Sequence, residues 1–238
     1  MNDKCNNTII SGNTLKGNYI GISAWSHEIS LPNYNIIVIG NTVEYNIVGL
    51  SISETHNGEI KDNTIQFSNS DGFDLYEVSN IIISNNTIFS NGYGGYAFGL
   101  RIEYSEDCEI LMNTVSNNSN DGIRIFYCSY IKVSNNIVDD NDQGIILYES
   151  DYNNITDNTI RGNTGEGIEL THSNCNRVTG NFLRDNGIYI AEKGDCVGNI
   201  IENNDCGGQQ PIPGFNIYLI LGLIGVISVI LMRKRFKN

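Results

Sequence analysis

The chain has 238 residues, of which 36 are Asn, 37 are Ile and 17% are charged. This Ile content excludes a disordered chain, and the Asn and Gly contents disfavour long helices because both residues are weak helix formers. The formal charge is −13; residues 1–210 hold 10 basic and 27 acidic residues, a balance of −17 that excludes nucleic-acid binding through basic side chains.

The first residues of the chain lack the features of an export signal. Met1–Cys5 contains no apolar stretch like that of a secretory signal peptide. The repeat pattern described next is already under way at this point. We therefore expect that the chain starts inside a repeat and is truncated at its N-terminus.

Two sequence markers recur with the same period along the chain. The first is an Asn two residues before an aliphatic residue, and it falls at Asn13, Asn41, Asn63, Asn86, Asn113, Asn136, Asn158 and Asn181, with a weaker ninth copy at Asn204. The second is a Gly before an apolar-x-apolar triplet, and it falls at Gly21, Gly49, Gly72, Gly99, Gly122, Gly144, Gly167 and Gly187. Most units are 22 or 23 residues long, and a fixed period in this range indicates a repeat architecture.

The content of one unit selects the architecture. Apolar residues occur in short runs separated by Asn and Gly, which leaves no room for a helix. Leucine-rich repeats require a Leu ladder, and propeller blades require about 40 residues. The sequence therefore predicts an all-β parallel β-helix of eight to nine coils over residues 1–208, with three short strands per coil.

The repeated Asn and Gly have scaffold roles in this prediction. We expect the Asn to adopt left-handed backbone at sharp turns and to bond one another from coil to coil, and the Gly to relax a second corner. Two inward stacks follow the Gly. One contains Ile22, Leu50, Phe73, Leu100, Ile123, Ile145, Ile168 and Ile188, and the other contains Ala24, Ile52, Leu75, Ile102, Ile125, Leu147, Leu170 and Ile190.

The pattern resembles a known superfamily. Asp157–Ile160 (DNTI) followed by Gly167–Leu170 (GIEL) is similar to the right-handed parallel β-helix repeats, which include NosD-like copper-accessory proteins and carbohydrate-binding and sugar-hydrolase domains. The resemblance covers nearly all of residues 8–205. It implies the fold but no particular reaction, since this superfamily has many functions.

Candidate functional residues alternate with the inward ones. Counted from each Gly, the second and fourth following residues point outward, and in the middle coils they mix rings with charges. These candidates are Asp74, Tyr76, Arg101, Glu103, Arg124, Phe126 and Tyr148. Rings that stack on sugars beside groups that bond hydroxyls suit a glycan. The alternative is a solvated sheet face with cross-strand pairs such as Asp74 with Arg101.

Two longer units add loops to this scaffold. One insertion spans residues 29–35 around Pro32, and the other spans residues 92–98 and contains Tyr93 and Tyr96. Binding residues often lie on loops that leave a rigid scaffold. Tyr93 and Tyr96 therefore join the predicted ligand-binding residues.

An enzyme needs an acid and a base. Asp71, Asp74 and Asp121 are expected close together at separations known from glycosidases, and Arg101 or Arg124 would be the base of a lyase. Acidic residues are frequent in this chain, however, so such a group arises readily by chance. We predict no catalytic residue and keep a polysaccharide lyase or glycosidase as the alternative.

Metal ligands and cysteines give less information. The three His lie in separate units, so we predict no metal site and no cofactor. Cys108 and Cys128 precede consecutive coils, as do Cys175 and Cys196, and each pair is a candidate disulfide. The alternative is that these cysteines are small ladder residues inside the coils.

The C-terminal segment predicts a membrane anchor. After a linker at residues 209–215, an uncharged apolar stretch at 216–232 precedes a basic tail at 233–238. This pattern predicts a single-pass transmembrane helix with the tail in the cytoplasm and the β-helix domain outside the cell. The alternative is a buried core helix. The segment Ile212–Phe215 (IPGF), with the span and the basic end, resembles the C-terminal sorting tails of archaeal surface proteins.

These patterns predict a cell-surface β-helix protein that is anchored in the cell membrane and binds glycan or envelope polysaccharide without catalysis. Its partners would be the glycan and the membrane, with no nucleic acid. A polysaccharide-degrading enzyme and a purely structural spacer or adhesin are the alternatives.

Overall fold

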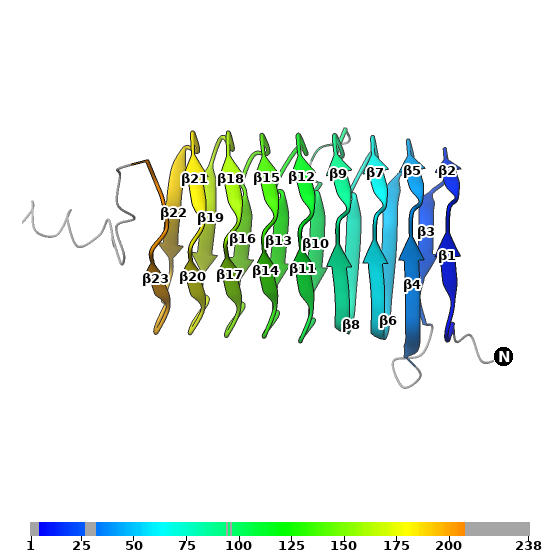
Figure 1. The fold of residues 1–238 in the computed structure, drawn as a ribbon, viewed down its shortest axis with the longest axis horizontal. Coiled ribbons are helices and arrows are strands. Elements are labelled where there is room, and N and C mark those ends of the chain that lie inside the picture. The colour runs from blue at the N-terminus through cyan, green and yellow to red at the C-terminus, as the bar shows by residue number, and fades with distance from the viewer. Residues whose placement is uncertain (1–4, 27–31, 94, 96, 208–238) are drawn as a thin grey trace, which may run out of the picture.

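The computed structural model describes residues 5–26, 32–93, 95 and 97–207, which form short strands joined by turns. Each coil has three strands, one on each face of a rod (Figure 1). The first face contains β3 (Ile20–Ala24), β6 (Val48–Lys61), β8 (Phe73–Ser84), β10 (Leu100–Glu103), β13 (Ile123–Phe126), β16 (Ile145–Tyr148), β19 (Glu166–Thr171) and β22 (Ile188–Lys193). The second face contains β1 (Ile9–Ser11), β4 (Asn33–Ile39), β11 (Glu109–Leu111), β14 (Lys132–Ser134), β17 (Asn154–Thr156), β20 (Arg177–Thr179) and β23 (Ile200–Glu202). The third face contains β2 (Thr14–Lys16), β5 (Thr42–Glu44), β7 (Thr64–Gln66), β9 (Thr87–Phe89), β12 (Thr114–Ser116), β15 (Ile137–Asp139), β18 (Thr159–Arg161) and β21 (Phe182–Arg184).

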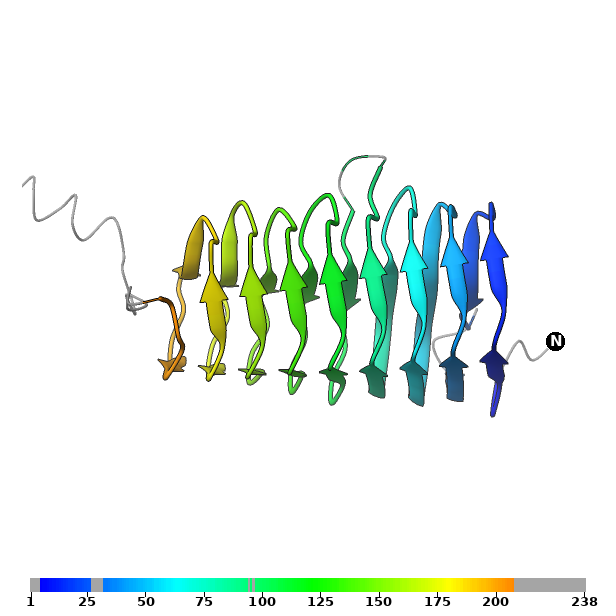
Figure 2. The same ribbon diagram turned by 45° about the horizontal axis from the view of Figure 1, so that its top comes forward.

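Every strand pairs in parallel with the equivalent strand of the next coil, as between β10 and β13 or β12 and β15. The long strands β6 and β8 run around a corner, so the first and second faces form one 15-stranded sheet, while the third face is an 8-stranded sheet. Eight stacked strands are joined by about seven complete turns, slightly fewer than the predicted eight to nine coils. The stacking follows chain order from β1 to β23 (Figures 1 and 2).

The predicted core stacks are confirmed except in the last coil. From β3 to β19 the inward residues of the first face are at most 4% exposed. In β22 the register differs: Ile190 pairs with Ile168, and Ile188 pairs with Glu166 and is half exposed. The last Gly marker, Gly187, comes only 20 residues after Gly167. Counting from it placed Ile188 opposite Ile168, two residues before the residue that pairs there, Ile190.

The Asn ladder is confirmed, although the reason given for it at the turn was wrong. The marker Asn residues form one column of hydrogen bonds from Asn13 to Asn204. The backbone N of each Asn from Asn13 to Asn181 donates to Oδ1 of the next Asn in the column at 2.9–3.0 Å. The left-handed residue is the one before the Asn, as at Asp62, Asn85 and Met112. The marker Asn thus closes the turn with its side chain while its neighbour supplies the strained backbone.

The Gly markers are required by close packing and not by a relaxed corner. Gly21 to Gly167 lack a positive φ, and a Cβ on Gly99 would lie 2.5 Å from Val115 Cγ1 and 2.7 Å from the Gly122 carbonyl oxygen. Successive coils approach each other here too closely for a side chain. The same residue type was therefore predicted at the correct place for a different reason.

Several predicted features lie outside the described residues. These are Tyr96, residues 29–31 of the first insertion, and the linker, span and basic tail of residues 209–238. Asn33–Asn35, from the end of that insertion, begins β4. In the part of the chain that the structure describes, no helix has the length and apolar character needed to span a membrane.

Candidate functional site

The outer surface of the first face carries three columns of side chains. Strand pairing places Asp74 beside Arg101, and Arg101 beside Arg124. The same pairing places Tyr76, Glu103, Phe126 and Tyr148 in a second column. The structure therefore brings together seven of the nine predicted ligand-binding residues: Asp74, Tyr76, Arg101, Glu103, Arg124, Phe126 and Tyr148. We call this surface of β8, β10, β13 and β16 the middle face.

A third column precedes each Gly marker and was not recognised as a column from the sequence. It contains Asp71, Phe98, Asp121, Gln143 and Glu166. Their side chains contact the two predicted columns, as the following distances show. The position directly before each Gly would have identified this column, since it repeats with the same period.

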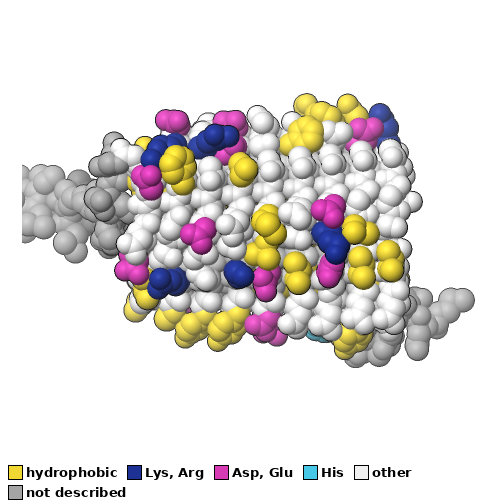
Figure 3. All heavy atoms as spheres, viewed as in Figure 1, with side chains coloured by type: hydrophobic (Ala, Val, Ile, Leu, Met, Phe, Trp, Pro, Cys, Tyr) yellow, Lys and Arg dark blue, Asp and Glu magenta, His cyan; other side chains and the backbone are white. Residues whose placement is uncertain are grey.

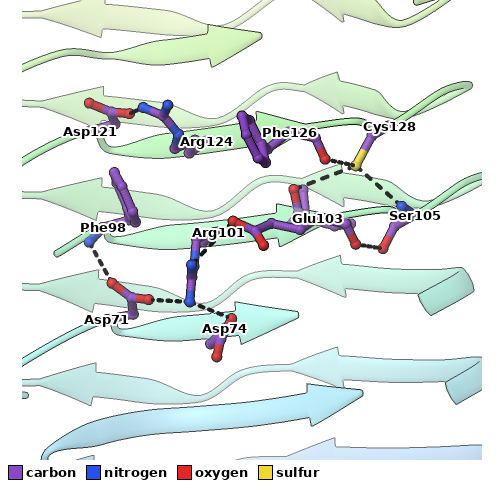
Figure 4. A network of polar contacts seen from close by, with 11 residues as sticks. Asp71, Asp74, Phe98, Arg101, Glu103, Ser105, Asp121, Arg124, Phe126 and Cys128 are labelled. Atoms are coloured by element: carbon purple, nitrogen blue, oxygen red, sulfur yellow. Dashed lines mark hydrogen bonds and ion pairs between the residues drawn. The ribbon is translucent and has the colours of Figure 1, made fainter. Parts of the chain in front are cut away.

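Arg101 is the centre of an ion-pair network on the middle face (Figure 4). Its Nη2 lies 3.1 Å from Asp71 Oδ2 and 3.0 Å from Asp74 Oδ1, and its Nη1 lies 3.1 Å from Glu103 Oε1. Asp71 Oδ1 also accepts a hydrogen bond from the Phe98 backbone N at 2.9 Å. Burial raises the pKa of Asp71, although this hydrogen bond and Arg101 act in the opposite direction. The guanidinium is thus neutralised within the protein.

Arg124 is neutralised in the same way by a carboxylate of its own coil. Its Nη1 lies 2.7 Å from Oδ2 of Asp121, which is fully buried. Its guanidinium also lies 5.1 Å from the centre of the Phe98 ring and 5.6 Å from that of Phe126. Phe98, at the end of the second insertion, therefore fixes the guanidinium from one side and Phe126 from the other.

Asp121 has an unusual environment for a carboxylate. Its Oδ1 has no hydrogen-bond partner among the described residues. Burial raises the pKa of Asp121 to about 6, although Arg124 acts to lower it. This carboxyl group therefore gains or loses its proton at mildly acidic pH.

The Asp121 environment predicts a pH dependence of stability. Because the folded-state pKa of Asp121 is raised, the contribution of this group to stability is fully present below about pH 4, falls by up to about 3 kcal/mol as the pH rises through 6, and then levels off. We expect Asp121→Asn to remove most of this fall, with Asp71 leaving a smaller one of the same sign. Urea unfolding between pH 3.5 and 7.5 measures it. Asp157→Asn, at an exposed position, is the control, and an equal slope in Asp121→Asn and wild type would refute the assignment.

Aromatic rings form a continuous row beside these charges. The centres of the Phe126 and Tyr148 rings are 5.0 Å apart, and Tyr104 and Tyr127 stack at 5.0 Å with 14° between their planes. Tyr76 joins the row through Tyr104 at 5.4 Å. Tyr104 and Tyr127 were not predicted, because they occupy left-handed turn positions at which sequence patterns favour Gly or Asn.

A hollow of about 420 Å³ adjoins this aromatic row at the corner between the first and second faces. Tyr104 and Tyr127 form one side of it, and Glu77 and Glu106 contribute carboxylates. The middle face therefore continues into a concave surface that has rings and hydrogen-bonding groups together.

The face remains acidic towards the C-terminal coils. Lys193 Nζ lies 2.7 Å from both Glu166 Oε1 and Glu169 Oε2, and Gln143 donates to the same two carboxylates. Over the three columns, six carboxylates face three cations. The carboxylates are Asp71, Asp74, Glu103, Asp121, Glu166 and Glu169, and the cations are Arg101, Arg124 and Lys193. With all groups ionised, this surface carries a net charge of −3.

Of the two remaining predicted residues, Tyr96 is outside the described part of the chain, and Tyr93 lies away from the middle face. Tyr93 is 77% exposed and lines a separate hollow on the corner after the third face. Among the residues that the structure describes, no group of three or more His, Cys, Asp or Glu is arranged to hold a metal ion.

The two candidate disulfides are not formed in the structure. All six cysteines are described and carry free thiols. Cys128 lies in the same column as Ser105 and Ser150 and forms a hydrogen bond with each. Cys108 lies in a different column, and its Sγ donates to the Glu106 carbonyl. Cys196 reaches the Leu170 carbonyl from the Ser column, whereas Cys175 occupies an exposed left-handed turn. Each predicted pair thus divides between two columns, and the ladder alternative holds for Cys108 and Cys128. Burial raises the pKa of both thiols to about 12.

The sequence matches the model of one protein family. The family is described as the right handed beta helix region, and the matches cover residues 1–101, 29–183 and 95–211. A comparison with curated proteins finds no match.

Several solved structures have the same fold. The periplasmic alginate epimerase AlgG superposes with a TM-score of 0.63 at 17% identity, over 74% of this chain and 51% of that one. The A-module of the mannuronan C-5 epimerase AlgE6 from Azotobacter vinelandii gives 0.57 at 15% identity, over 75% and 66%. The Dettilon tailspike protein gives 0.56 at 17% identity, over 81% and 47%. The chain spans about half the length of AlgG, and at these identities the likeness establishes the fold alone.

Proposed function

The chain belongs to the right-handed β-helix family, and on this scaffold we propose that the middle face binds a glycan without catalysing its cleavage. The observation that carries the proposal is the row of Phe126, Tyr148 and Tyr76 beside fixed carboxylates and guanidinium groups. Ring faces pack against the apolar faces of sugars, and the charged groups bond hydroxyls. The names of two structural neighbours, an alginate epimerase and a mannuronan C-5 epimerase, support a glycan as the ligand class.

The charge of the face favours a neutral glycan over a polyuronate such as alginate. Arg101 already contacts three carboxylates, and Arg124 contacts the buried Asp121. Neither guanidinium is available to neutralise a uronate, and the excess of carboxylates repels one. A neutral sugar chain avoids this cost and still uses the exposed edges of the ion pairs as hydrogen-bonding groups.

A screen of immobilised glycans tests this proposal. The full chain, kept in mild detergent because its C-terminal segment is apolar, is offered neutral cello-, manno- and chito-oligosaccharides and oligomers of mannuronate and guluronate. We expect at least one neutral series to bind at least tenfold more tightly than the uronates at physiological salt. No binding to any neutral series, or a preference for the uronates, would contradict the proposal.

Asp121 favours one second candidate, an enzyme that cleaves polysaccharide. A carboxyl group with a pKa of about 6 is able to donate a proton near neutral pH. Its complete burial beneath Arg124 argues for a structural role instead. Release of reducing or unsaturated sugar ends by the wild type, lost in Asp121→Asn, would establish the enzyme in place of the binding protein.

We propose that this domain is held at the cell surface. Residues 216–232 would cross the membrane, and 233–238 would remain in the cytoplasm, as basic residues beside a span do. The NosD-like character and the archaeal type of the tail are parts of the same proposal and rest on sequence resemblance. Protease added to intact cells should remove the β-helix domain and leave a C-terminal epitope protected. Digestion of the epitope alone would indicate the opposite orientation in the membrane.

A further inference from the structure

A second hollow, of about 360 Å³, lies on the corner between the third and first faces. No residue that lines it is charged. The lining consists of Gly17, Asn18, Tyr19, Tyr45, Asn46, Ile47, Phe67, Asn69 and Tyr93. Hydrophobic side chains gather along the upper edge of the molecule over the ends of β5, β7 and β9, which is the region of this hollow (Figure 3). We call it the corner hollow.

The rings of the corner hollow are rigid and open to solvent. Tyr45 and Phe67 stack with centres 5.0 Å apart and 25° between their planes, and Phe89 supports Phe67 edge-on at 5.6 Å. Tyr45 is 52% exposed and Tyr19 73%. Both stacked residues have positive φ, where Gly or Asn is the usual choice. The stacked pair therefore lies outside the buried core, at the surface of the turn.

Amide groups surround these rings. Asn46 is fixed because its Nδ2 donates to the Leu15 and Glu44 carbonyls and its Oδ1 accepts from Asn18. Asn69, in contrast, is exposed at the rim of the hollow. The nearest cation, Lys16, lies over the Tyr45 ring and is paired with Glu44 at 3.2 Å. The hollow thus presents exposed aromatic residues and an amide with little net charge.

We infer that the corner hollow is a second binding site, which takes a neutral sugar unit. Its volume lies in the range of small-molecule sites. The exposed rings of Tyr19 and Tyr93 suit the apolar face of a sugar, and the Asn69 amide suits a hydroxyl. The uncharged lining offers nothing to compensate a carboxylate or an ammonium group. This site is separate from the middle face, which the sequence had singled out.

The second insertion connects the two sites. Tyr93, near its start, lines the corner hollow, while Phe98, at its end, packs on Arg124 of the middle face. Ser119 Oγ holds the segment between them by donating to the Gly95 carbonyl oxygen at 2.7 Å. The inference nevertheless concerns the hollow alone and is tested independently of the middle face.

The test compares two matched pairs of stacked rings. In Tyr45→Asn/Phe67→Asn the rings of the hollow are removed, and Asn retains the left-handed backbone. Tyr130 and Tyr152 stack at 5.6 Å with 15° between their planes and also have positive φ, so Tyr130→Asn/Tyr152→Asn is the control. Circular dichroism and thermal melting verify that both variants are folded. Saturation-transfer NMR with cellotetraose and mannotetraose, together with mannuronate tetramer, measures binding to the full chain in detergent.

We expect transfer from the wild type to at least one neutral tetramer. In the Phe126→Ala/Tyr148→Ala background, which removes the middle-face component, we expect Tyr45→Asn/Phe67→Asn to weaken the remaining signal at least fivefold and Tyr130→Asn/Tyr152→Asn to leave it unchanged. The Phe126→Ala/Tyr148→Ala variant alone should keep the part of the transfer signal that arises at the corner hollow. Equal signals with and without Tyr45→Asn/Phe67→Asn in this background overturn the inference, even where the middle-face variant binds more weakly than wild type and the proposed function stands. No transfer to either neutral tetramer, or a stronger signal with the uronate, also overturns it.

Discussion

Replacing Asn113 by alanine is expected to lower the free energy of unfolding by roughly 2–5 kcal/mol. Asn113 is 1% exposed and lies in the middle of the Asn ladder. Its Oδ1 accepts from the backbone N and Nδ2 of Asn86, and its Nδ2 donates to the Ile83 carbonyl at 2.9 Å. Alanine leaves the Asn86 N–H and the Ile83 carbonyl buried without these partners, each at a cost of about 1–3 kcal/mol.

Equilibrium unfolding in urea measures this loss, and Asn69→Ala is the matched control. Asn69 is exposed and outside the ladder, so its replacement should change the free energy by less than about 0.5 kcal/mol. If the two variants unfolded at the same urea concentration, the ladder would not stabilise the coils as argued.

Gly99→Ala is expected to be at least as damaging, because it forces two coils apart. The added Cβ would lie 2.5 Å from Val115 Cγ1 and 2.7 Å from both Asn118 Nδ2 and the Gly122 carbonyl oxygen. The last contact is with backbone that pairs in register with the next coil, so it cannot move without disturbing β13. We expect a loss of about 3 kcal/mol or more, at or above the upper end for overpacked cores.

Gly165→Ala separates this effect from the general cost of adding a methyl group. There the new Cβ would meet the Gln143 Cγ atom at 3.1 Å and the Asp142 carbonyl oxygen at 3.2 Å, and the backbone has no positive φ. Both contacts exceed 3.0 Å, so shifts of a few tenths of an ångström relieve them, and we expect a change below about 1 kcal/mol, again by urea unfolding. Comparable losses at both positions would show that coil spacing is not what requires Gly99.

The repeat could be predicted from sequence because its markers report on buried positions. The Asn and Gly columns and both inward stacks follow one period, and burial leaves little freedom in residue type. The physical roles of the Asn and Gly markers were harder to predict from the sequence. A left-handed φ at Met112 or Asp62 has no distinctive residue type, so the strain was assigned to the more regular Asn beside it.

The candidate site divides in the same way. Strand register alone places Asp74 beside Arg101 and Phe126 beside Tyr148, so these neighbours were predictable. The neutralisation of Arg124 was not, since it depends on how far Asp121 is buried and on the position of Phe98 at the end of a loop. The corner hollow was missed because Tyr45 and Phe67 occupy turns, where no alternation marks a side chain as outward.

The binding role of the middle face is tested most directly by calorimetric titration of the full chain with the neutral oligosaccharide that binds best in the glycan screen. The account predicts at least tenfold weaker affinity for Phe126→Ala/Tyr148→Ala than for wild type. It predicts unchanged affinity for Tyr130→Asn/Tyr152→Asn, whose stacked rings lie further along the turns that lead to the second face and outside the middle face. Equal affinity of the Phe126→Ala/Tyr148→Ala variant and the wild type, with both folded, would contradict it.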